Sequence, residues 1–86
     1  MPRISEFLGI IISMFFRDHF PAHFHAKYAE FEALIGIDPI IIVEGKLPPR
    51  IRSLVFEWAA MYQHQLREDW ELARKKEELK LIPPLE

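Results

Sequence analysis

The pattern of apolar positions changes at Pro48-Pro49. Before these prolines apolar residues tend to alternate with other residues, and after them they recur at helical spacing. The pattern predicts a β-rich half over residues 1–47, a helical half over 48–78 and an extended tail over 79–86. Because 86 residues leave room for one small core, we expect a single domain over 1–86.

Strand-like segments are predicted over residues 10–16, 23–28, 31–37 and 40–43. Pro21 falls in the loop between the first two, where it removes no hydrogen bond from a ladder. If Ala29-Glu30 is a two-residue turn, Tyr28 pairs with Phe31 and the apolar faces of both strands coincide. A longer loop, or a register shifted by two residues, remains open.

The helical stripe that begins after Pro49 is interrupted at Asp69. We therefore expect either one long bent helix over 49–76 or two helices that meet near Arg67, since a straight helix of that length would measure about 40 Å. The predicted fold is α+β, a small antiparallel sheet of three or four strands with one long, bent or broken C-terminal helix packed on one face. The expected core residues are Ile10, Ile12, Met14, Phe16, Phe24, Ala26, Phe31, Ala33, Ile35, Leu54, Val55, Trp58 and Tyr62.

Three of the four histidines lie within seven residues, and they are the most conspicuous candidates for chemistry. Strand alternation places two of them on the face away from the core. This run can hold a divalent transition metal such as Zn or Ni, or can supply a general base. An ordinary outward-facing role is an equal alternative. The candidate metal ligands are His19, His23, His25 and Asp18, and the candidate catalytic residues are His23, His25, Lys27 and Glu32.

Phe56 and Trp70 fall off the core stripe, on the same outer side of a continuous helix. Two aromatic residues on one outer side favour a partner interface, with either a different protein or a second copy of the chain. The formal net charge of −2 disfavours a nucleic-acid partner. The absence of cysteine excludes disulfides and thiolate zinc sites. Since the apolar run from Leu8 to Phe16 is too short to span a bilayer, we expect a cytoplasmic protein with no membrane association.

Four segments of the chain resemble a small bacterial family of unknown function, forty-one-sixty in the domain-of-unknown-function series. They are Pro2-x-Ile4-x-x-Phe7-x-Gly9-Ile10, Asp18-His19-x-Pro21-x-His23-Phe24-His25-Ala26-x-Tyr28, Glu57-Trp58-Ala59 and Trp70-Glu71-Leu72-Ala73. The resemblance implies that the chain is encoded beside a second small protein, in a pair of the kind proposed as toxin–antitoxin modules. It implies no particular activity or catalytic residue.

These observations lead to two functional hypotheses of different classes. The first is a protein-interaction component of a bacterial two-protein module, the toxin-like or regulatory half, whose partner is a small cognate protein encoded nearby. The second is a small metal- or histidine-dependent enzyme, for example a nuclease, that uses the cluster of His19, His23 and His25.

Overall fold

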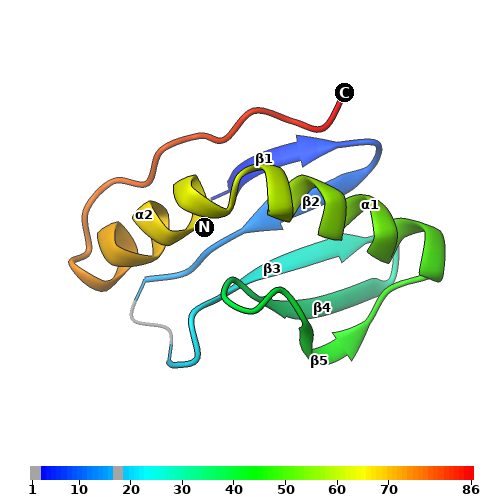
Figure 1. Ribbon diagram of the computed structural model, residues 1–86, viewed down its shortest axis with the longest axis horizontal. Helices are drawn as coiled ribbons and strands as arrows, with labels where there is room; N and C mark the ends of the chain where they lie inside the picture. The colour runs from blue at the N-terminus through cyan, green and yellow to red at the C-terminus, as the bar shows by residue number, and fades with distance from the viewer. Residues whose placement is uncertain (1–2, 17–18) are drawn as a thin grey trace.

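The computed structural model describes residues 3–16 and 19–86 and has an α+β fold (Figure 1). Within these residues, five antiparallel strands form one sheet in the order β1-β2-β3-β4-β5, so each strand pairs with its neighbour in the chain. Both described helices lie on the same face of this sheet. The α+β class is confirmed, whereas three or four strands was an underestimate. The elements are β1 (Arg3–Phe7), β2 (Ile10–Ser13), β3 (His23–Tyr28), β4 (Phe31–Gly36), β5 (Ile42–Lys46), α1 (Pro49–Met61) and α2 (Gln63–Arg74).

The strand that the sequence pattern missed is β1, which forms a hairpin with β2. Leu8 and Gly9 make the turn with φ values of 51° and 80°, the left-handed pair that suits a two-residue hairpin. The register shifts between Arg3 and Ser5, so Ile4 and Ser5 are both buried although they are adjacent. This irregularity removes the alternation by which a strand is recognised.

The hairpin between β3 and β4 has the predicted register. Tyr28 pairs with Phe31, and Lys27 pairs with Glu32. Ala29 adopts a left-handed conformation with φ 52°, which allows the two-residue turn. The longer loop and the register shifted by two residues are both excluded.

The fourth predicted strand begins two residues later than expected and forms the β5 edge. A register shift in the β4–β5 ladder places Ile42 opposite Ile35 and Glu44 opposite Leu34, which leaves Val43 as the extra residue. Gly45 has φ +82° and lies so close to the backbone of β4 that an added Cβ would collide with Glu32 and Ala33. The bulge and the glycine make β5 an irregular edge, which discourages pairing with another strand.

Over the described residues 49–76, the helical half consists of two helices that meet at Tyr62, rather than a single helix or a pair broken near Arg67. Tyr62 leaves the helical conformation with φ −117° and ψ 28°. Backbone hydrogen bonds nevertheless continue across it, from Tyr62 N to Trp58 O and from Leu66 N to Tyr62 O. The Gln63 side chain donates to Ile37 O over 2.7 Å, which holds the start of α2 against the end of the sheet. Neither of these two described helices has the length and apolar character needed to cross a membrane.

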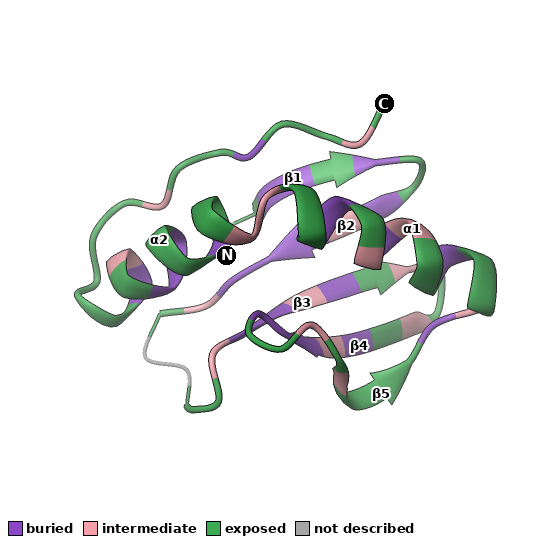
Figure 2. Cartoon of the chain, in the orientation of Figure 1, coloured by how far each residue is buried: buried purple, intermediate pink, exposed green. Residues whose placement is uncertain are grey.

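The core lies between the helices and the sheet, and the exposed residues of both helices face away from it (Figure 2). Trp58 is fully buried at its centre, with its ring 5.5 Å from that of Phe7 and 5.8 Å from that of Phe24. Most of the expected core is buried. Phe16 was assigned wrongly, because β2 ends at Ser13 and the Phe16 side chain is 45% exposed. Three other expected core residues are only half-buried, namely Phe31, Leu54 and Tyr62.

The tail over residues 79–86, which the structure describes throughout, has neither helix nor strand and runs along β1 (Figure 1). Ile82 N donates to Ile4 O over 2.8 Å, which covers one backbone acceptor on the β1 edge. The Trp58 indole donates to Pro83 O over 2.8 Å, and Lys80 N donates to Asp69 Oδ1 over 2.9 Å. Two buried side chains of the helices therefore hold the tail in place.

Candidate functional site

The side chains of the histidine run meet at the start of β3. The ring centroids of His19 and His23 are 5.5 Å apart, and those of His23 and His25 are 5.3 Å apart. His23 and His25 are two residues apart on β3, so their side chains point to the same face of the sheet. The loop that precedes β3 contributes His19. The three imidazoles form one group, which we call the histidine cluster.

His23 is buried, with 1% of its surface exposed. Its Nδ1 lies 2.8 Å from Pro21 O, and since a carbonyl oxygen only accepts, Nδ1 carries the proton in this contact. Its ring is 5.4 Å from the ring of Trp70 on α2. The expectation that His23 faces outward, away from the core, is therefore wrong, because Trp70 covers this end of β3.

His25 lies two residues after His23 on β3 and lines a cavity of about 130 Å³. Its ring packs edge-to-face against Phe15 at 4.4 Å, and its Nδ1 lies 3.6 Å from Glu32 Oε2. Lys27 and Glu32 also line the cavity, so three of the four candidate catalytic residues come together and His23 does not. We call this cavity the sheet-face pocket; its lining residues are Arg3, Ile11, Ser13, Phe15, His25, Lys27 and Glu32.

The register of the sheet explains why these side chains share one face. Ser13 pairs with His25, and Ile11 pairs with Lys27, which in turn pairs with Glu32. Paired residues point to the same side of a sheet, and here that side is opposite to Phe24 and Ala26. Arg3 joins the group through its pairing with Ser13. Sequence reasoning missed Arg3 because it missed β1, although Gly9, directly before the apolar run of β2, is a residue type favoured in turns.

The structure describes only three of the four predicted metal ligands. Among residues 3–16 and 19–86, no group of three His, Cys, Asp or Glu side chains is arranged to hold a metal ion. Asp18, one of the four predicted ligands, lies outside the described residues. The Nδ1 of His19 lies 3.1 Å from Phe20 O, so His19 and His23 both direct Nδ1 to a backbone carbonyl. In metal sites such a contact fixes the other ring nitrogen as the ligand.

A second cavity, of about 380 Å³, lies between α2 and the loops that precede β3 and follow β4. Phe20 forms one wall and is 64% exposed, with its ring 5.9 Å from that of Trp70. Two ion pairs form the polar part, one between Arg67 and Asp38 at 2.9 Å and one between Arg74 and Glu71 at 3.5 Å. We call this cavity the α2 groove; its lining residues are Phe20, Ala22, Ile37, Asp38, Arg67, Trp70 and Glu71.

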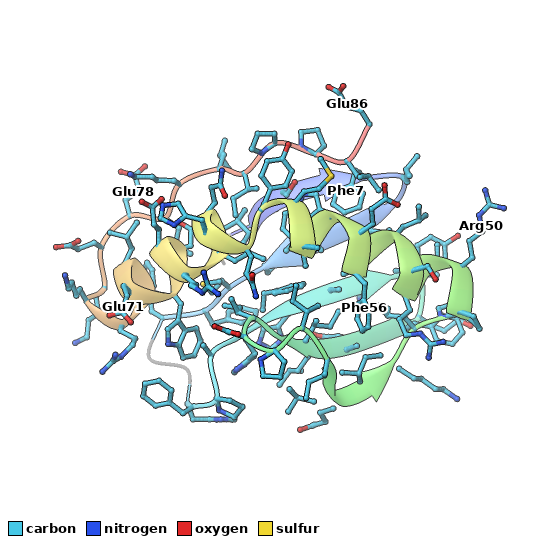
Figure 3. All side chains as sticks on the ribbon, in the orientation of Figure 1. Phe7, Arg50, Phe56, Glu71, Glu78 and Glu86 are labelled. Atoms are coloured by element: carbon cyan, nitrogen blue, oxygen red, sulfur yellow. The ribbon has the colours of Figure 1, made fainter. Side chains whose placement is uncertain are left out.

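The two residues predicted to form a partner interface have different environments. Trp70 is 3% exposed, so the expectation of an outward-facing ring is wrong, although the ring lines the α2 groove. The side of α2 that carries Trp70 faces inward, because the helix is interrupted at Tyr62 and α2 starts at Gln63. Phe56 is half-buried on α1 and packs against the core (Figure 3). Glu71, also labelled in Figure 3, lies on α2 and lines the α2 groove. Phe20 was not singled out from the sequence, since a single aromatic residue in a loop carries no pattern.

Comparison with known proteins relates most of the chain to one protein-family model. No curated protein and no solved structure matches the chain. The family model, described as "Domain of unknown function (DUF4160)", matches residues 9–71, a range that includes the histidine run and most of α2. Because the match covers well over half of the 86 residues, the chain belongs to the DUF4160 family.

Proposed function

We propose that this protein is the interaction component of a bacterial two-protein module, the toxin-like or regulatory half, and that it binds a small cognate protein encoded nearby. Membership of the DUF4160 family is consistent with this role without specifying it. The observation that carries the proposal is the exposed ring of Phe20 at the mouth of the α2 groove. An exposed aromatic residue beside an apolar depression is typical of a protein-binding surface.

The α2 groove suits an apolar side chain presented by the partner. Its inner wall is apolar, being formed by Ala22, Ile37 and the ring of Trp70. The described charges around it are paired with one another, so they give the entrance no excess of either sign. Affinity should therefore come mainly from apolar burial and should depend only weakly on salt.

The test is co-purification of the full chain with the product of the neighbouring gene. Phe20→Ala should weaken the complex about tenfold or more, as expected for an aromatic residue at the centre of an interface. Leu81→Ala is the matched control, because Leu81 is 80% exposed on the tail and does not line the groove. Near-UV circular dichroism checks that Phe20→Ala keeps its tertiary packing. If a folded Phe20→Ala variant binds as tightly as the unmodified protein, the α2 groove is not the interface.

The sheet-face pocket favours the second hypothesis, a histidine-dependent enzyme. Here His25, Lys27 and Glu32 supply an imidazole, an ammonium group and a carboxylate in one cavity. Such groups can move protons and neutralise a developing negative charge. When the 2′-hydroxyl of RNA attacks the adjacent phosphodiester, the protein does not need to supply a nucleophile. RNA is therefore the substrate to test.

The enzymatic hypothesis predicts RNA cleavage that is lost in His25→Gln and retained in His64→Gln. His64 is a suitable control because it lies on α2, exposed and paired with Glu68. Metal analysis of protein purified without a histidine tag examines the metal-dependent form of the hypothesis. Absence of cleavage by the unmodified protein, with and without added Zn or Ni, would count against this function.

A further inference from the structure

We propose that the sheet-face pocket binds the carboxylate of a small organic acid with a flat apolar body, and that Lys27 is the group that pairs with it. This proposal does not depend on the interaction or the enzymatic hypothesis. It rests on the Lys27 ammonium group, on the other residues that line the pocket and on its size.

Among the described residues, the Lys27 ammonium group forms no ion pair. Arg3 pairs with Glu6 at 2.7 Å, and His25 lies 3.6 Å from Glu32. Lys27 faces Glu32 in the register of the sheet, yet within the described ranges it has no carboxylate oxygen within 4.0 Å. A negative charge on a ligand would therefore give the Lys27 ammonium group an ion-pair partner within the pocket.

The remaining lining residues fit a carboxylate that is attached to an apolar group. Ser13 contributes a hydroxyl, which can donate to a carboxylate oxygen. Ile11 and Phe15 contribute apolar surface beside it, and the Phe15 ring is held edge-to-face on His25. An anion that enters between them contacts polar atoms at one end and carbon atoms at the other.

The size of the pocket and the Glu32 carboxylate in its lining limit the ligand further. The cavity measures about 130 Å³, close to the roughly 150 Å³ of a protein cavity that accepts benzene. A ligand of one small ring or less fits, whereas a nucleotide does not. Each negative charge on the ligand is repelled by the Glu32 carboxylate, so a monocarboxylate is favoured over a dicarboxylate.

The experiment is a titration of the ¹⁵N-labelled full chain at neutral pH, followed by amide chemical shifts. Benzoate is the probe, and benzamide is its neutral analogue of the same shape. We expect saturable shifts of Ser13, His25 and Lys27 with benzoate and much weaker shifts with benzamide. Lys27→Gln should weaken benzoate binding about fivefold or more, as befits a partly solvated ion pair with a hydrogen bond.

Lys46→Gln is the matched control. Lys46 lies opposite Glu32 in the register of β4 and β5, on the same face of the sheet, but does not line the pocket. The affinity of this variant for benzoate should equal that of the unmodified protein. The proposal is overturned if benzoate causes no saturable shifts, if benzamide binds equally well, or if both lysine variants weaken binding to the same extent. Because Phe20 does not line this pocket, failure here leaves the partner-binding experiment unaffected.

Discussion

Replacing Asp69 with Asn should stabilise the protein at neutral pH and should leave its stability nearly unchanged in acid. The Asp69 carboxyl is almost fully buried on α2, and its Oδ1 accepts the Lys80 N–H over 2.9 Å. Its Oδ2 is buried and has no hydrogen-bond partner among the described residues. Burial raises the pKa of Asp69 above its ordinary value, against the lowering effect of the Lys80 hydrogen bond.

The direction of the pH dependence follows from this raised pKa. Between the ordinary pKa of about 3.8 and the raised pKa, the folded protein retains a proton that the unfolded chain has lost. The contribution of Asp69 to stability is therefore complete below the ordinary pKa and is lost as the pH rises through the folded pKa. Each unit of separation between the two pKa values is worth about 1.4 kcal/mol.

The amide introduced by Asp69→Asn would resemble the protonated acid, since it keeps the acceptor for Lys80 N and has no charge to bury. The difference in unfolding free energy between Asp69→Asn and the unmodified protein should be near zero in acid and should increase to a plateau as the pH rises. For a domain of this size, each kcal/mol corresponds to a change in Tm of about 4–8 °C. Asp69→Ala separates the two effects, because it also leaves the Lys80 N–H unsatisfied at a cost of about 1–3 kcal/mol.

Urea unfolding followed by circular dichroism, repeated from acid to neutral pH, measures these differences. Comparing variants at each pH cancels the titration of the other carboxylates and of the histidines. If Asp69→Asn is less stable than the unmodified protein at neutral pH, the ionised carboxylate stabilises the fold and the reasoning is wrong.

Three further sets of substitutions examine the fold, each by urea unfolding. Gly45→Ala should cost about 2 kcal/mol or more, because φ is +82° and the added Cβ meets the backbone of β4; an unchanged midpoint would contradict this. Trp58→Phe should cost at least about 1–2 kcal/mol, because it removes the hydrogen bond to Pro83 O and leaves a cavity in the core, and it should speed proteolysis of the tail. His23→Gln should destabilise the fold by about 1–3 kcal/mol, whereas His25→Gln should change stability by less than about 1 kcal/mol. Equal losses for the two histidines would mean that burial does not distinguish them.

The hairpin of β3 and β4 was predictable because local and global preferences agree there. Alternation in both segments selects one register, and that register needs only a two-residue turn at Ala29-Glu30. The grouping of His25, Lys27 and Glu32 follows directly from it. For this part of the candidate site, strand periodicity alone was sufficient.

The features that were missed depend on departures from regular geometry or on contacts distant in sequence. The register shift near Ser5 disguised β1, and Arg3 was lost from the site with it. The break at Tyr62 turned Trp70 inward, which no stripe drawn on a continuous helix could show. The Gln63 contact with Ile37 O, formed across 26 positions of the chain, holds α2 in this orientation.

The ring contacts connect the two candidate surfaces through His23. Its ring touches His25, which lines the sheet-face pocket, and Trp70, which lines the α2 groove. Residues two apart on a strand point the same way, so the sequence presents His23 and His25 as equivalent. They differ in burial because the Trp70 ring lies against His23 at the start of β3, whereas His25 lines the pocket. His23 therefore contacts both the Pro21 carbonyl and the Trp70 ring, whereas His25 lies in the pocket for which we propose a carboxylate ligand.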